Sequence, residues 1–201
     1  MLIAAGRNAL LTSGKAGFTH IGALLDISTP TQAAGARQAV TWQAAGTPAA
    51  GQAGNNGAIS IPIAAGETVV ATALWDASTA GNRLSLDPIG STVKGVGSVV
   101  SAASDTIQSN GHGLTTDDRV FFAAVMGEAL PAGVLGTVIY FVLASGLTAD
   151  AFKVSTTSGG AALDITGLGE VQFYKTVPNV FASAGNLTIA TNALLLDVNG
   201  L

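Results

Sequence analysis

The sequence predicts an all-β protein with one short helix at its start, and three observations support this prediction. After roughly the first dozen residues, apolar and polar residues alternate over short runs, which is the period of a half-buried strand. Turn-forming Gly, Asn, Asp, Ser and Thr separate these runs about every eight to twelve residues, as in β-sandwiches and β-barrels. No segment alternates strands with long helices, which argues against a dinucleotide-binding fold.

The helix is expected over "LIAAGRNALLTSG", residues 2–14. Leu2, Ala5, Ala9 and Leu10 would share one side of it. Gly14 lies where the end of a helix favours a residue with positive φ. We therefore predict a single helix that ends at this glycine.

Strands follow in the first part of the chain. In "FTHIGALLD", residues 18–26, alternate side chains would face opposite sides of a strand, and in "ARQAVTWQAA", residues 36–45, Val40 and Trp42 share a face. "GTPAAGQAGNNG", residues 46–57, has no periodicity and predicts a connector.

The clearest alternation lies in "AISIPIAAGETVVATALW", residues 58–75. Apolar side chains alternate before a turn at "AAGE" and again after it, which predicts two strands separated by that turn. Pro62 cannot donate to a β-ladder, so its strand should lie at an edge or contain a bulge. The alternating residues are Ile59, Ile61, Ile63, Val69, Ala71, Ala73 and Trp75.

A second series of strands begins at about residue 92. Strands are predicted at residues 96–100 and in the segments "DTIQS", "RVFFAAV", "TVIYFVLA", "AFKVSTT", "ALDIT" and "EVQFYKTV". The final segment "NLTIATNALLLDVNG" alternates again, with Leu187, Ile189 and Thr191 on one side, and with Leu194, Leu196 and Val198 continuing later.

Charged residues make up 10% of the 201 residues, compared with about 25% in an ordinary soluble domain. So few charges suggest that much of the surface contacts other protein, most simply copies of the same chain. The alternative is a general alanine-rich bias in composition. The net charge of −4, with scattered Lys and Arg, argues against nucleic-acid binding.

Other classes of protein are disfavoured by what the chain lacks. There are no cysteines, so disulfides and thiolate metal sites are excluded. The start "MLIAAGRNALL" does not resemble a secretory signal. Residues 130–147 are uncharged, but Pro131 and three glycines flank a β-branched and aromatic core, which predicts a strand between turns and not a membrane span.

The segment "NGHGLTTDDRVFF", residues 110–122, has the composition of an active-site loop. However, His112 and His20 belong to different segments and do not form a zinc-ligand array. Asp117 and Asp118 are neighbours that point to opposite faces of a strand, so they cannot flank one glycosidic bond. We interpret the segment as a turn before a strand that starts at Arg119, and we predict no catalytic, metal or cofactor site.

Two further patterns are interpreted as structural. The glycines of "TSGGAALDITGLGE" lack the Lys-Ser/Thr and the helix of a phosphate-binding loop. Trp42 and Trp75 could stack on a sugar, but their alternating strand positions favour core packing.

Two segments resemble structural proteins of tailed bacteriophages. "AAGRNALLTSGKAGFTHIGALLD", "ARQAVTWQAA" and "ISIPIAAGETVVATALWDASTAGNRL" resemble a family of small phage minor tail or head-fibre proteins over residues 1–91. That family has an "AR-x-A-V/I-T-W" segment and a hairpin with "W-D-A-x-x-G-G". This chain departs from it at Asn82, where a second glycine is usual.

The second segment runs from "DTIQSNGHGLTTDDRVFF" through "LPAGVLGTVIYFVLASGL" and "AFKVSTT" to "GGAALDITGLG". It is similar to a β-rich module of phage tail, fibre and baseplate proteins, with the pattern "H-G-L/F-x-x-G-D-x-V-x-F". Asp117 replaces the common glycine of that pattern.

The tail "FASAGNLTIATNALLLDV" resembles the last strands of the first family. The resemblances therefore imply a β-sandwich base, formed by residues 1–91 and 177–201. A small β-rich sandwich or barrel, residues 92–176, would be inserted in one of its loops.

The resemblances imply a non-enzymatic structural component of a virion that is assembled in the host cytoplasm. A minor tail or tail-fibre-like protein is expected, forming trimers or higher rings with itself and contacting neighbouring virion proteins, without nucleic acid, membrane or cofactor. The alternatives are a capsid decoration or head-fibre protein, and an adhesin for a host-surface glycan. A depolymerase would need an acidic pair in a cleft.

Overall fold

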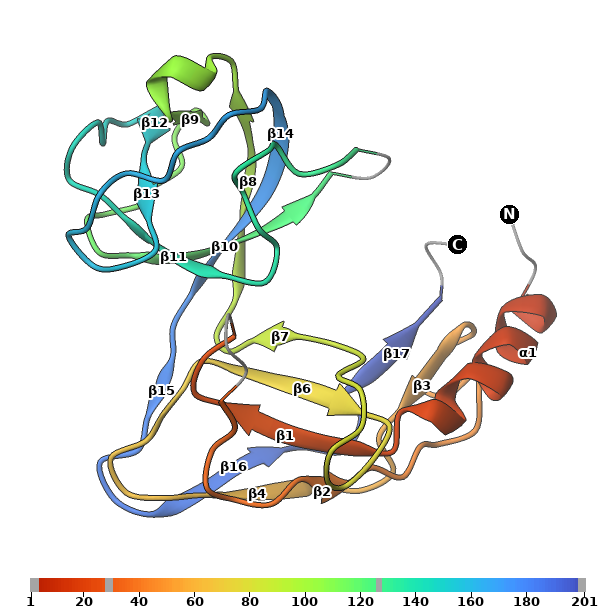
Figure 1. Cartoon of the computed structure of the whole chain (residues 1–201). Coiled ribbons are helices and arrows are strands. Elements are labelled where there is room, and N and C mark those ends of the chain that lie inside the picture. The colour runs from red at the N-terminus through yellow and green to blue at the C-terminus, as the bar shows by residue number, and fades with distance from the viewer. Residues whose placement is uncertain (1–3, 28–30, 126–127, 199–201) are drawn as a thin grey trace. The chain divides into compact units, whose positions relative to one another are not determined.

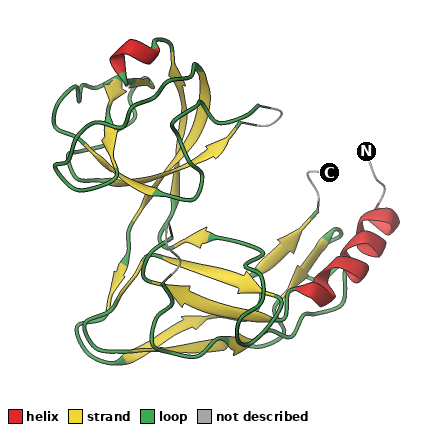
Figure 2. Ribbon diagram, viewed as in Figure 1, coloured by secondary structure: helices red, strands yellow, loops and turns green. Residues whose placement is uncertain are grey.

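The computed structural model describes residues 4–27, 31–125 and 128–198, and it is rich in strands with one short α-helix near its start (Figures 1 and 2). The all-β prediction is confirmed. The chain divides into two compact units. Unit 1 comprises Met1–Asp26, Pro30–Asp87 and Val180–Leu201, and unit 2 comprises Ile27–Thr29 and Pro88–Asn179.

The predicted helix is present as α1 (Ala4–Gly14), but two of its details were wrong. Gly14 has φ −76°, and the chain continues into a 3-10 helix, η1 (Lys15–Gly17), so the glycine ends no helix in a left-handed conformation. Leu10 is exposed and Leu11 is buried. The buried side is set by tertiary contact, because Asn8 Oδ1 accepts a hydrogen bond from the Gly51 N–H (2.8 Å). Leu2 lies outside the described residues.

The central sheet of unit 1 has four antiparallel strands in the order β2-β1-β6-β7. These are β1 (His20–Leu24), β2 (Gln38–Ala39), β6 (Ala71–Trp75) and β7 (Asp87–Pro88). Side chains on both faces of β1 are buried, including Ile21, Ala23 and Leu24. The predicted strand at residues 36–45 is much shorter than expected, since only β2 forms, with Val40 buried beside it.

The C-terminal segment returns to pair with three strands of the first part of the chain. β15 (Asn179–Val180) pairs with β5 (Thr68–Val69), β16 (Gly185–Ile189) with β4 (Ile59–Ile63), and β17 (Leu195–Asp197) with β3 (Gln52–Gly54). The alternation in β4 is confirmed, because its three isoleucines are buried. Pro62 lies in a two-stranded ladder, the edge position predicted for it.

Unit 2 is a single seven-stranded sheet in the order β12-β9-β8-β14-β10-β11-β13. The outermost strands β12 and β13 are separated only by Lys153, so one short segment pairs with both ends of the sheet. The sheet therefore closes into a small barrel that leaves no free edge. Its strands are β8 (Thr92–Val99), β9 (Ile107–Gln108), β10 (Arg119–Ala124), β11 (Ile139–Val142), β12 (Ala151–Phe152), β13 (Val154–Ser155) and β14 (Gly169–Thr176), with a 3-10 turn η2 (Ala102–Ser104) between β8 and β9.

The barrel is filled by side chains from nearly every strand. The core includes Val99, Ile107, Val120, Phe122, Tyr140, Val142, Phe152, Val154, Ile165, Val171 and Phe173. The predicted strand "ALDIT", residues 162–166, does not form. The backbone N–H groups of this segment donate to three different parts of the chain, so no single β-ladder forms. Leu163 donates to the Val154 carbonyl, Ile165 to Asp105 Oδ1, and Thr166 to the Ala132 carbonyl.

The two ends of the middle segment meet. The Val177 N–H donates to the Ile89 carbonyl (3.2 Å). The transitions between the units fall near residues 87 and 180, a few residues outside the boundaries predicted from sequence. The independence of the inserted module remains a prediction.

Deleting residues 92–176 should leave a folded unit 1, because the ends that must be joined already lie close together. Both tryptophans of the chain belong to unit 1, so their fluorescence reports on that unit alone. Cooperative urea unfolding by tryptophan fluorescence is the expected result. An aggregated or non-cooperative product would show that the two units fold as one.

Candidate functional site

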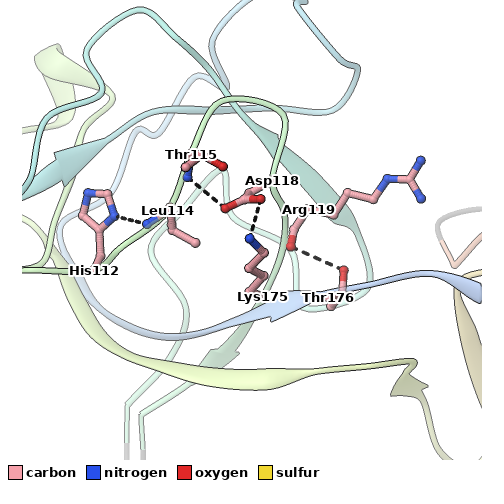
Figure 3. Close-up of polar contacts among 7 residues, drawn as sticks. All are labelled: His112, Leu114, Thr115, Asp118, Arg119, Lys175 and Thr176. Carbon is pink, nitrogen blue, oxygen red and sulfur yellow. Dashed lines mark hydrogen bonds and ion pairs between the residues drawn. The ribbon is translucent and has the colours of Figure 1, made fainter.

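The segment 110–119 forms a compact turn (Figure 3). Gly111 (φ +61°), Gly113 (φ +63°) and Asp117 (φ +65°) all adopt left-handed conformations. Asp117 is the residue that stands in place of a common glycine, and an aspartate tolerates this conformation better than most residues. The geometry is that of a turn that delivers Val120 and Phe122 into the barrel core.

His112 is buried inside the barrel. Its Nδ1 accepts a hydrogen bond from the Leu114 N–H (3.0 Å), and its ring packs edge-on against Phe152 at 5.0 Å between centroids. An accepting Nδ1 places the proton of the neutral ring on Nε2. This nitrogen is buried and has no hydrogen-bond partner among the described residues. The buried His112 ring therefore stabilises the turn through its hydrogen bond with the Leu114 N–H and its contact with Phe152.

The adjacent carboxylates of Asp117 and Asp118 have separate partners. Asp117 accepts a hydrogen bond from Ser158 Oγ (2.7 Å). Asp118 accepts one from the Thr115 N–H (2.8 Å) and forms an ion pair with Lys175 (2.6 Å), as Figure 3 shows. Burial alone would raise the pKa of Asp118, but the Lys175 ammonium and the Thr115 N–H outweigh it and hold the pKa below its ordinary value.

Asp118→Asn should destabilise unit 2 by about 1–2 kcal/mol at pH 7, because the ion pair is only partly solvent-exposed. A carboxyl group whose pKa is lower in the folded than in the unfolded chain stabilises the fold when it is ionised. This stabilisation is fully present above the unfolded pKa, near 4, and it is lost as the pH falls through the folded pKa. The wild type should therefore lose stability below about pH 4 more steeply than the variant. Near-UV circular dichroism of the two tyrosines, both in unit 2, measures this.

The control for this experiment is Asp164→Asn, since Asp164 is also an aspartate of unit 2 but is exposed. Asp164→Asn should change the stability at pH 7 by less than about 0.5 kcal/mol. Equal pH profiles for wild type and Asp118→Asn would contradict the assigned role of the ion pair.

The other candidate residues belong to different segments and units of the chain. His20 belongs to unit 1, where Thr19 Oγ1 lies 2.9 Å from its Nδ1, while His112 belongs to unit 2. Within the described ranges, no three His, Asp or Glu side chains are placed to share a metal ion. Trp75 is buried, as predicted. Trp42 is half-buried and donates from Nε1 to the Phe18 carbonyl (2.6 Å).

The structure joins two motifs that the sequence presented separately. The Arg37 guanidinium lies 4.1 Å from the centroid of the Trp75 ring and donates to the carbonyls of Ala77 and Ala80. The carboxylate of Asp76 accepts hydrogen bonds from the side chain and the backbone N–H of Asn82, and these lower the pKa of Asp76. Arg37 thereby holds the 76–82 loop against β6.

The left-handed positions of this loop are Ala80 (φ +52°) and Gly81 (φ +69°). Counted from Trp75, the two glycines of the family's "W-D-A-x-x-G-G" pattern fall at residues 80 and 81, so the departure expected at Asn82 lies at Ala80. In the structure, Asn82 instead serves as the donor to Asp76, and the conformation that favours glycine begins at Ala80.

Asn55 is a structural residue that the periodicity did not reveal. It lies in the segment predicted as an irregular connector, yet its side chain is fully buried. Its Nδ2 donates to the carbonyls of Gly57 (2.7 Å) and Ala190 (3.0 Å), and its Oδ1 accepts from the Leu194 N–H (3.0 Å). The connector prediction was wrong here, because β3 and Asn55 tie the C-terminal segment to unit 1.

A pocket of about 300 Å³ opens on the barrel. Lys153 is the one ionisable side chain of its lining, so the pocket holds no acid–base pair for catalysis. The lining residues are Leu143, Ala144, Ser145, Lys153, Gly159, Gly160 and Ala162.

The outer surface of the barrel carries apolar side chains in register. On the face opposite the core, Val93, Tyr174, Phe121 and Ile139 form one row across β8, β14, β10 and β11. Val93 is 57% exposed. A contiguous apolar strip on a strand surface is typical of a surface that contacts protein.

Comparison with known proteins gives one finding about family. A family model described as "Podophage GP4 fiber I protein gp80" matches residues 19–110, fewer than half of the residues in the chain. No curated protein and no solved structure matches the chain. The family match supports a structural, non-enzymatic protein of a phage fibre, and therefore a component of the virion. Within the described residues, no helix has the length and hydrophobicity needed to cross a membrane.

Proposed function

We propose that this chain is a fibre-like structural component of the tail of a phage particle. Unit 1 docks on the particle, and unit 2 is a barrel module that it presents. The observation that carries this proposal is the match of residues 19–110 to a podophage fibre family. The resemblance of residues 105–169 to a β-rich module of tail, fibre and baseplate proteins supports the same role.

The sheet edges and the low charge of the chain are consistent with a structural protein in an assembly. The barrel has no free sheet edge, so it is protected from uncontrolled strand pairing. In this proposal, unit 1 contacts neighbouring subunits through its two-stranded ladders. With charged residues at 10% of the chain, such contacts bury few ions, whose desolvation is costly. Its partners in this proposal are copies of itself and neighbouring virion proteins.

A head fibre on the capsid is the nearest alternative, because it needs the same docking base and presented module. The glycan adhesin receives less support. It requires clusters of exposed tryptophan or tyrosine on the module, but both tryptophans lie in unit 1. Of the two tyrosines in unit 2, Tyr140 is buried, so Tyr174 has no second tyrosine or tryptophan with which to form such a cluster.

The test is cryo-electron microscopy of purified particles of the phage that encodes the chain, with gold-labelled antibody against unit 2. Label at the tail is expected, and label on the capsid would assign the chain to head fibres. The absence of the chain from washed particles would overturn the structural role. Particles carrying the 92–176 deletion should keep the base and lose the label, which tests the division of roles between the units.

A further inference from the structure

The outer surface of the barrel between β8 and β11 is built from residues that alternate with the core. Phe122 and Phe173 point into the barrel, and their strand neighbours Phe121 and Tyr174 therefore point outward. The next outward row along the strands contains Val96, Gln172 and Ala123. We call the two rows together the outer face.

Contacts within the outer face order its side chains. The rings of Phe121 and Tyr174 lie 6.3 Å apart, and the Tyr174 hydroxyl donates to Gln172 Oε1 (2.8 Å). Val93 and Val96 are 57% and 48% exposed, respectively. The face therefore presents an ordered apolar surface to solvent, and such a surface is stabilised when protein covers it.

Opposite charges lie at the two ends of the outer face. Glu170 is exposed beyond the Val96 row. Arg119 lies beyond the Tyr174 row, where it stacks 5.3 Å from the Phe141 ring centroid. Lys94, the extra residue at a bulge in β8, is exposed near the same end. Neither Arg119 nor Glu170 has an ion-pair partner among the described residues.

This pattern is complementary to itself. Glu170 and Arg119 are three outward rows apart, about 20 Å along the strands. Rotation by 180° about an axis that lies in the plane of the face, between the two rows and parallel to them, exchanges the positive and negative ends. It places the Tyr174 row of each copy against the Val96 row of the other. A surface of this kind satisfies the requirement of an isologous interface.

We infer that a second copy of this chain docks on the outer face through a twofold axis, with Arg119 of each copy opposite Glu170 of the other. The inference adds a self-contact surface to the proposed function. It rests on that function only for the role of the dimer in a phage particle. The geometry favours protein over sugar, because the rings adjoin Val93, Ile139 and Ala123 and the Tyr174 hydroxyl is already hydrogen-bonded. Sugar sites need polar groups beside the ring to bind hydroxyls.

The test is sedimentation velocity with light scattering on the purified full-length chain from about 1 to 100 μM. The wild type should reach twice its mass of 19.8 kDa. Arg119→Glu and Glu170→Arg should each weaken dimerisation by about tenfold or more, because each places like charges together. The double variant Arg119→Glu/Glu170→Arg restores opposite charges and should return the dissociation constant to within about threefold of wild type.

Val96→Asp should also weaken the dimer, and Val180→Asp is its matched control. Val180 is 67% exposed but belongs to β15 of unit 1 and is not part of the outer face. Thermal unfolding of each variant checks that the chain remains folded. A monomeric wild type at 100 μM, a trimer, or a double variant as weak as the singles would overturn the inference. So would a glycan-array signal that is lost with Tyr174→Ala in a monomeric chain, which would assign the face to a sugar. Each of these results is independent of where the chain lies in a particle.

Discussion

Replacing Trp75 with alanine should lower the free energy of unfolding of unit 1 by about 3–5 kcal/mol. The Trp75 ring is buried at the end of β6 and packs in the core of unit 1. A Cβ on Gly22 would lie 3.2 Å from the ring, which is tighter than most Cβ contacts, so glycine at this position lets the indole lie close to β1. The Arg37 guanidinium also stacks on the ring, 4.1 Å from its centroid. Removing the indole leaves a cavity and also removes the surface on which Arg37 rests.

Urea unfolding followed by the fluorescence of the remaining Trp42 measures the change in unit 1. Leu84→Ala is the control, because Leu84 is 42% exposed and its truncation should cost less than about 1 kcal/mol. Arg37→Met keeps much of the alkyl stem but removes the stacking charge and the donors to Ala77 and Ala80. It should give an intermediate loss of about 1–2 kcal/mol. A loss below 1 kcal/mol for Trp75→Ala would mean that the ring does not support the core.

Asn55→Ala should destabilise unit 1 by about 3 kcal/mol, although it removes no apolar surface. Its amide makes three hydrogen bonds at a position without solvent access. The alanine variant leaves one backbone donor and two carbonyls without this partner. Because the bonds join residues 57, 190 and 194, the loss should also release the C-terminal strands, which hydrogen exchange of their amides can detect.

The neighbouring Asn56 provides a control of the same residue type. Its side chain is exposed, so Asn56→Ala should change the stability by less than about 0.5 kcal/mol. Equal effects of the two substitutions would show that the buried amide network contributes little. Faster amide hydrogen exchange in the barrel but not in the C-terminal strands would contradict the prediction that Asn55 holds these strands in place.

Local chemistry was sufficient to predict many elements of this protein. Strand period depends on neighbouring residues alone, so the isoleucines of β4 and the alternation in β10 and β14 were predictable. Backbone conformation is similarly local, and Gly111 and Gly113 adopt the positive φ that their turn required. Asp117, which stands in place of a common glycine, also adopts a left-handed conformation.

Contacts between distant segments were beyond such reasoning. The closure of the barrel depends on one five-residue segment that pairs with β9 at one end and with β11 at the other. Asn55 has its partners at residues 190 and 194, and Arg37 meets a tryptophan on another strand. Leu11 is buried in place of Leu10 because the helix docks through Asn8. Periodicity and turn chemistry depend on adjacent residues and can be deduced in advance, whereas pairing, register and burial depend on which remote segments the chain brings together.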